Sequence, residues 1–316
     1  MNAAIDAVVC LLLVSAAVVG LVTVEQSPPP PPGRADAVAD TLATTTAQVD
    51  YSLAPGVREV AASEEGPDVS DVPLDSPELD RTAHGSLAEL LARATTSTSG
   101  VDFVSTASAG RNATPAPASE IPPLTRTRAT FRRGVADAVR ARTGATVRVD
   151  ATWRPYPGAP VGGAVGVGTK PPRDGVHAAT LVVPTGVEPI PRSATWDFES
   201  LGDAVAERTV AVLVPAGPAK TTLRGNDPSA ALLRHRYARL ETEIDGADSA
   251  ENASLAEPLA TEDTAAANER LAAAIAPRVT ADLRARYDSP VAAADAVSVS
   301  SVRIVVRTWS ASAEVR

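Results

Sequence analysis

The chain has 316 residues and a net charge of −9, with 44% hydrophobic but only 3% aromatic residues. That composition excludes wholesale disorder and indicates a core built from Ala, Val and Leu. The acidic balance, without a basic patch, argues against nucleic-acid binding, and the single Cys10 excludes an internal disulfide and a cysteine metal site.

The N-terminal segment contains a long uncharged apolar run, Ala7–Val24. As a helix it would be about 27 Å long, close to the roughly 30 Å of a hydrocarbon core. We therefore expect residues 1–26 to form a transmembrane anchor that contacts lipid through residues 7–24. A buried core helix and a cleaved signal are the alternatives. The absence of Lys and Arg in residues 1–6 favours a retained anchor over a signal.

A linker and an acidic region follow the apolar run. Residues 27–33 contain five consecutive prolines, which favour a polyproline II spacer of about 20 Å. In the region 34–80, helical spacing predicts a helix over Arg34–Gln48, followed by a short strand over Val49–Leu53. Residues 63–80 are rich in carboxylates and prolines and predict a solvated loop, with no spacing typical of a calcium loop.

The remaining residues, 81–316, predict a soluble domain of mixed helices and strands. Ser86–Thr95 predicts a helix, because Ser86 and Glu89 have the spacing of a capping box. Apolar residues at four-residue spacing predict a helix over Thr125–Arg142. Alternation with period two over Thr146–Trp153 predicts a half-buried strand.

The C-terminal half continues to mix both kinds of element. Residues 154–175 are rich in Gly and Pro. We predict strands over Ala178–Val183, Val210–Val214 and Val297–Trp309, and helices over 199–207, 217–244 and 255–287, the last with a break before Pro277. The elements lack a β-α-β-α rhythm, so the expected fold class is α+β: an N-terminal transmembrane helix, a proline linker and a mixed domain.

Two segments resemble phosphate-binding loops but lack their chemistry. Val210–Thr222 has an apolar run, a loop and Lys220 before a helix. A phosphate loop needs glycines whose N–H groups surround the phosphate, whereas here Pro218 lacks an N–H and Ala219 precedes the lysine. The Gly-rich residues 158–170 end in two prolines rather than a helix. We interpret the first segment as a structural strand-to-helix turn and the second as a flexible hairpin or loop.

Other candidate groups also fail to form a reactive pattern. The histidines do not follow a metal-binding spacing, and the carboxylate pairs lie four apart in a chain where such pairs are common. These residues are His84, His177 and His235, and the pairs Asp203/Glu207 and Glu241/Asp245. The sequence therefore predicts no catalytic residue, no cofactor-binding residue, no metal ligand and no cofactor.

The opening AAIDAVVCLLLVSAAVVGLVTV, the acidic region behind it and a content of only two lysines carry a resemblance. They resemble uncharacterised haloarchaeal single-span membrane proteins encoded near archaeal type IV pilus-like genes. The resemblance implies a pilin-like or pilus-accessory envelope protein with no known catalytic residues. The chain departs from an archaeal prepilin in having no basic residue before the apolar run.

We therefore expect a membrane-anchored, non-enzymatic envelope protein, an accessory or minor subunit of a pilus-like assembly. Its soluble domain is expected outside the cell, where it binds protein partners. The sequons at Asn112 and Asn252 agree with that location. The final strand offers a pairing surface if it lies at a sheet edge. The alternatives are a membrane-tethered enzyme acting on an envelope substrate and a cytoplasmic-facing adaptor.

Overall fold

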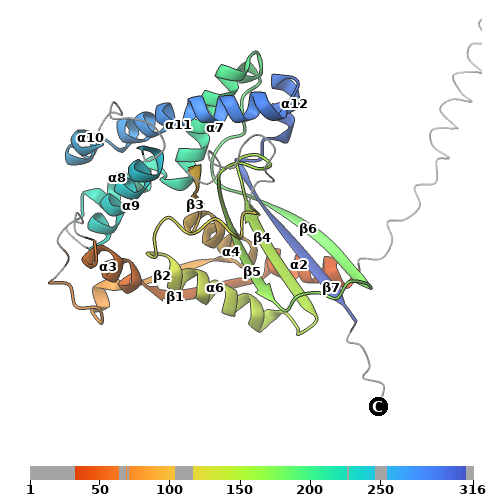
Figure 1. The fold of residues 1–316 in the computed structure, drawn as a ribbon. Coiled ribbons are helices and arrows are strands. Elements are labelled where there is room, and N and C mark those ends of the chain that lie inside the picture. The colour runs from red at the N-terminus through yellow and green to blue at the C-terminus, as the bar shows by residue number, and fades with distance from the viewer. Residues whose placement is uncertain are drawn as a thin grey trace, which may run out of the picture.

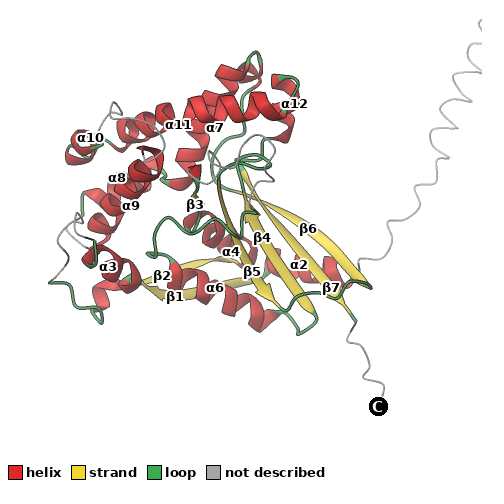
Figure 2. Cartoon of the chain, in the orientation of Figure 1, coloured by secondary structure: helices red, strands yellow, loops and turns green. Residues whose placement is uncertain are grey.

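The computed structural model describes residues 33–63, 69, 71–103, 117–225, 228–245 and 255–310. The fold is α+β, as predicted, with two antiparallel sheets and helices around them (Figures 1 and 2). The predicted anchor and all but the last residue of the proline linker lie outside the described residues. None of the helices within the described ranges is long and apolar enough to cross a membrane.

The strands form a hairpin and a larger sheet. β1 pairs with β2, and the five-stranded sheet has the order β3-β5-β4-β7-β6. The strands are β1 (Thr46–Ser52), β2 (Asp80–Ser86), β3 (Gly100–Val101), β4 (Val147–Trp153), β5 (Val161–Gly168), β6 (Val176–Pro184) and β7 (Ser301–Trp309).

The helices cover one face of the larger sheet and form a second group beside it (Figure 2). They are α2 (Arg34–Thr44), α3 (Ala54–Ala61), α4 (Leu87–Ser97), α6 (Ala129–Arg142), α7 (Phe198–Leu213), α8 (Ala216–Leu223), α9 (Pro228–Asp245), α10 (Ala256–Ala260), α11 (Thr264–Arg286) and α12 (Pro290–Ala296). Helices α2, α4 and α6 pack on the sheet, and α7 packs along α11.

The larger sheet has one buried and one open face, as the alternation in β4 predicted. Val149 and Ala151 have no exposed surface and face the helices. Asp150 faces the other way, where its carboxylate accepts from Arg148 and Arg307, each at 2.7 Å. The open face thus carries charge, while the covered face holds the core.

The predicted strand Val210–Val214 is wrong, because these residues form the end of α7 and the residue after it. Asp197 caps this helix by accepting from the Ser200 N–H at 2.7 Å. The helix is buried on most sides, since Val205, Val210 and Leu213 are nearly inaccessible. A helix buried all round gives the same short apolar run as a buried strand, so periodicity does not separate the two.

The predicted break before Pro277 is also wrong, since α11 continues through it. Leu271, Ile275, Val279 and Leu283 are all buried and lie at four-residue spacing across the proline. This continuous apolar stripe, packed mainly on α7, stabilises the helix on both sides of Pro277 and outweighs the lost hydrogen bond. The predicted helix over 217–244 is instead divided into α8 and α9.

The larger sheet decides two further predictions. The Gly-rich residues 158–170, interpreted as a hairpin or loop, contain β5, which pairs antiparallel with β4. Its glycines allow close packing, because a Cβ on Gly163 would lie 2.3 Å from the Thr95 carbonyl oxygen of α4. The final strand begins at Ser301 rather than Val297 and lies between β4 and β6, so it is not at an edge. The proposed pairing surface on this strand is therefore wrong.

Candidate anion-binding cleft

A cleft of about 520 Å³ is lined by residues of α4, of the segment before α6, and of helices α8 and α9. We call it the arginine cleft. Its lining includes Arg81, Arg93, Arg128 and Arg236, and no described aspartate or glutamate. In a chain with 38 acidic and 29 basic residues, a cleft with this lining is unusual in its charge.

Arg236 of α9 is held by the ends of two helices. Its Nε donates to the Leu213 carbonyl at 3.2 Å, and its Nη1 to the Ser97 carbonyl at 3.3 Å. These residues end α7 and α4, whose last carbonyls need donors from outside the helix. The remaining nitrogen, Nη2, is buried without a hydrogen-bond partner in the described part of the chain. The guanidinium is therefore fixed in orientation, with both N–H groups of Nη2 unused.

The charge of Arg236 is not compensated by a carboxylate. Desolvation, and to a lesser extent repulsion from the nearby guanidinium of Arg128, together lower its pKa to about 10. No ion pair with a described carboxylate opposes these two effects. Two positive charges thus lie near each other where water solvates Arg236 poorly, and a bound anion would stabilise them.

Arg128 and Arg93 are positioned by neutral groups. Arg128 donates to the Tyr51 hydroxyl and lies 5.2 Å from the centre of that ring. Arg93 of α4 donates to the His84 carbonyl at 3.1 Å and lies 5.9 Å from the centre of the Phe131 ring. Contacts with aromatic rings and carbonyls orient a guanidinium without neutralising it. Both side chains therefore keep their charge available at the cleft.

Two hydroxyl groups add further donors to the same wall. Thr125 and Thr127 precede α6, and the Oγ1 of each is buried without a hydrogen-bond partner among the described residues. A buried polar group without a partner costs about 1–3 kcal/mol. Together with Nη2 of Arg236, three buried polar groups lining the cleft are unsatisfied. A ligand with several acceptor oxygens would satisfy them.

A second cavity of about 540 Å³ adjoins the first, and Thr125 lines both. His235 lines it from α9; this residue is only 6% exposed, and its Nε2 has no partner in the described structure. Desolvation lowers the pKa of His235, which the charge of Glu59 partly offsets. The sequence predicted all three histidines to be surface or packing residues. His84 and His177 are exposed, as that interpretation expects. His235 is buried and lines the second cavity.

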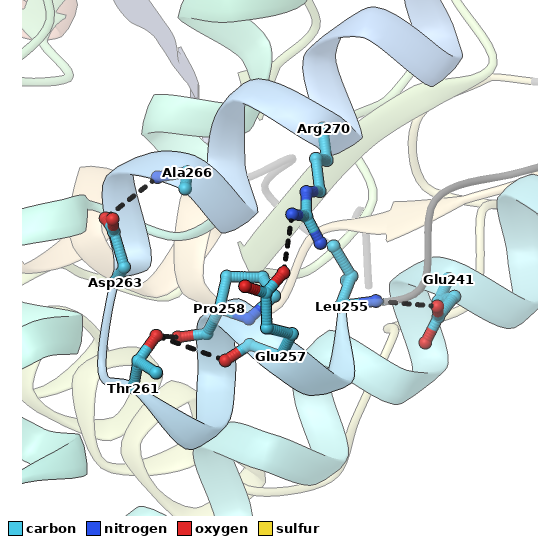
Figure 3. Close-up of polar contacts among 8 residues, drawn as sticks. All are labelled: Glu241, Leu255, Glu257, Pro258, Thr261, Asp263, Ala266 and Arg270. Atoms are coloured by element: carbon cyan, nitrogen blue, oxygen red, sulfur yellow. Dashed lines mark hydrogen bonds and ion pairs between the residues drawn. The ribbon is translucent and has the colours of Figure 1, made fainter.

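Of the two carboxylate pairs, the structure describes the side chains of Asp203, Glu207 and Glu241. Asp203 and Glu207 are exposed on α7. Glu241 instead accepts from the Leu255 N–H at 3.2 Å, just before α10, and this contact lies beside the ion pair of Glu257 with Arg270 at 2.9 Å (Figure 3). These carboxylates hold α10 and α11 to their neighbours. The side chain of Asp245 and the sequons at 112 and 252 lie outside the described residues.

The segment that resembles a phosphate loop does not have the backbone of one. Lys220 is exposed within α8, and the residues around it form helix rather than a glycine loop. Within the described ranges, no three His, Cys, Asp or Glu side chains lie together as metal ligands. Thr222 of this segment does line the arginine cleft. The segment rejected as a phosphate loop is thus part of the wall of a different candidate anion site.

Sequence reasoning missed every arginine of the cleft. Arg93, Arg128 and Arg236 are far apart along the chain, and each looks like an ordinary surface charge next to apolar residues. No motif connects them. The available signal was weak: an Arg–His–Arg run at 234–236 within an otherwise apolar stretch of a predicted helix.

A family model described as a family of unknown function (DUF7284) matches residues 5–309. The chain belongs to this family. No curated protein and no solved structure matches it. The matched range includes both the apolar run at 7–24 and all residues of the arginine cleft. Both features are therefore within the region that defines the DUF7284 family.

Proposed function

We propose that this protein is a membrane-anchored, non-enzymatic envelope protein that binds an anionic ligand in the arginine cleft. The observation that carries the proposal is the set of guanidinium groups in the cleft, of which Arg93, Arg128 and Arg236 have no described carboxylate partner. The apolar run at 7–24 and the prolines after it support the anchor. An accessory role in a pilus-like assembly agrees with both features.

The position of the cleft supports a ligand that arrives from the side away from the anchor. The described chain starts at Gly33, and the next residue, Arg34, donates to the Trp309 carbonyl at 3.3 Å, at one end of the larger sheet. At the other end, Pro184 pairs with Ser301, and Thr185 lines the cleft. Nine residues of strand span about 30 Å. The cleft and Arg34 therefore lie at opposite ends of β6 and β7.

Binding is favoured over catalysis by the kinds of side chain in the cleft. Acid–base and nucleophilic mechanisms need a group that changes protonation near neutral pH or a nucleophile next to a base. The described lining offers arginines, threonines, serines and one tyrosine, without His, Asp, Glu or Cys. A tethered enzyme is the second candidate, and it would have to use His235 and Glu59 of the adjoining cavity.

The anion-binding part is tested with the full chain in lipid nanodiscs at constant ionic strength. Thermal unfolding is measured with chloride, sulfate, phosphate or acetate as the added anion. We expect an anion that binds the cleft to raise the unfolding temperature of wild type and of Arg234→Met by the same amount. The unfolding temperature of Arg236→Met should not rise. Arg234 is exposed on the same helix and does not line the cleft, so it is a matched control. Equal responses of all three proteins would refute the proposal.

The anchoring and orientation are tested in intact cells. Cys10 is replaced by Ser, and a single cysteine is introduced at the exposed Ala238 of α9. We expect a membrane-impermeant maleimide to label this cysteine without lysis, and the protein to remain with membranes after salt washing. Labelling only after lysis would favour the cytoplasmic adaptor, and release by washing would contradict the anchor.

A further inference from the structure

The arginine cleft offers more donors than a carboxylate ligand accepts. A carboxylate has two oxygens with about four acceptor sites, and a single guanidinium takes two of these sites in a bidentate pair. Here Nη2 of Arg236 and the hydroxyls of Thr125 and Thr127 are unsatisfied, and Arg93 and Arg128 add their charges. A phosphate monoester has three acceptor oxygens and a charge near −2 at neutral pH. Both the number of donors and the charge thus match a phosphate monoester better.

A second part of the cleft lining is apolar. It consists of Leu213, Val214 and Pro215 between α7 and α8, Pro218 of α8 and Leu233 of α9. An inorganic anion would occupy only a small part of a volume of about 520 Å³. That volume lies in the range of sites for organic ligands, which combine a largely apolar lining with a few polar groups. The remaining space therefore fits an apolar group attached to the anion.

From these two walls, and resting on the anion binding proposed above, we infer that the ligand is an amphipathic phosphate monoester. Its phosphate lies against Arg236, Arg128 and the two threonine hydroxyls, and its apolar part lies along Leu213–Pro218 and Leu233. The same chemistry is found in a soluble organic phosphate and in a lipid headgroup such as phosphatidic acid. The experiment below distinguishes these two sources.

The test compares three probes on the full chain in phosphatidylcholine nanodiscs by isothermal titration calorimetry, with empty nanodiscs as the blank. The probes are hexyl phosphate, inorganic phosphate and hexanoate. We expect hexyl phosphate to bind about tenfold or more tightly than either of the others, because burying about two methylene groups already gives a tenfold gain. Hexyl phosphate binding that is no tighter than that of inorganic phosphate would overturn the inference.

Variants assign the two ends of the ligand. Arg236→Met is expected to weaken both phosphate probes about tenfold or more, whereas Leu233→Ser weakens only hexyl phosphate. Arg234→Met should bind all probes as wild type does, and circular dichroism confirms that each variant is folded. A Leu233→Ser protein that retains the full preference for hexyl phosphate would contradict the assigned apolar wall.

The outcomes separate this inference from the proposed function. If hexanoate binds as tightly as hexyl phosphate, anion binding stands and the phosphate ester is wrong. If no anion binds, both are wrong. Adding phosphatidic acid to the nanodiscs identifies the source once hexyl phosphate binds. Weaker apparent binding of the probe then indicates competition from the headgroup, and unchanged binding supports a soluble phosphate ester.

Discussion

Replacing Arg236 by methionine should leave the free energy of unfolding almost unchanged in the absence of ligand. The guanidinium makes two hydrogen bonds, at 3.2 and 3.3 Å, which are long for a charged donor. At about 1.5 kcal/mol each, the low end for charged groups, they contribute about 3 kcal/mol. Desolvation and Arg128 lower the pKa to about 10, and each pKa unit corresponds to about 1.4 kcal/mol. Keeping the charge here therefore costs about 3 kcal/mol, which offsets the hydrogen bonds.

The assay is urea unfolding of the full chain at neutral pH, with and without phosphate. Without phosphate we expect wild type and Arg236→Met to agree within about 1 kcal/mol, since the two contributions cancel. With saturating phosphate, wild type alone gains stability, because a ligand that binds only the folded state shifts the equilibrium. A loss of about 3 kcal/mol without phosphate would refute this reasoning. It would identify Arg236 as a cap for α4 and α7 whose charge is well tolerated.

Two further predictions test the packing and the pH response. Gly163→Ala should lower the free energy of unfolding by about 2 kcal/mol or more, because the new Cβ would lie 2.3 Å from the Thr95 carbonyl oxygen. A Cβ on Gly166 would instead meet two side-chain ends, the Arg148 guanidinium at 2.2 Å and the Asp150 carboxylate at 3.2 Å, so Gly166→Ala should disturb that ion pair and cost less, about 1 kcal/mol or less. Urea midpoints of both variants check this, and equal losses would contradict it. Burial raises the pKa of the Tyr237 phenol, whose folded form therefore stays protonated above about pH 10 while the unfolded form ionises. The contribution of Tyr237 to the free energy of unfolding is thus fully present below about pH 10. Above that pH it falls by about 1.4 kcal/mol per pH unit. Tyr237→Phe should reduce this alkaline loss in urea titrations at rising pH, and an unchanged slope would exclude Tyr237 as its source.

Local signals in the sequence predicted the elements whose ends or faces are encoded by neighbouring residues. The capping box at α4 forms as expected, since Ser86 accepts from the Glu89 N–H at 3.2 Å and its own N–H donates to the Glu89 carboxylate at 2.9 Å. The helix predicted over Thr125–Arg142 begins four residues later, at Ala129. The strand predicted over Val49–Leu53 is shifted to Thr46–Ser52.

Strand β2 was missed because its sequence carries no strand pattern. Of its seven residues only Ala83 is buried, and the rest are polar, small or charged. It is a strand because all seven residues pair with β1, from Asp80 opposite Ser52 to Ser86 opposite Thr46. Pairing with a distant segment decided the conformation where local propensity did not. The same holds for β5, where glycines that weaken a strand are required by the approach of α4.

The arginine cleft illustrates why a binding site in an acidic chain is hard to predict from sequence. Elsewhere in the described structure, arginines such as Arg148, Arg284 and Arg307 pair with carboxylates. In the cleft, an acidic residue in place of Ser97 would supply a carboxylate beside Arg236. An acidic residue in place of Thr125 would supply one between the two cavities. Leaving the guanidiniums unpaired instead costs stability, and such a cost persists in proteins where function requires it. The informative feature is therefore the missing carboxylate, which only the assembled fold makes visible.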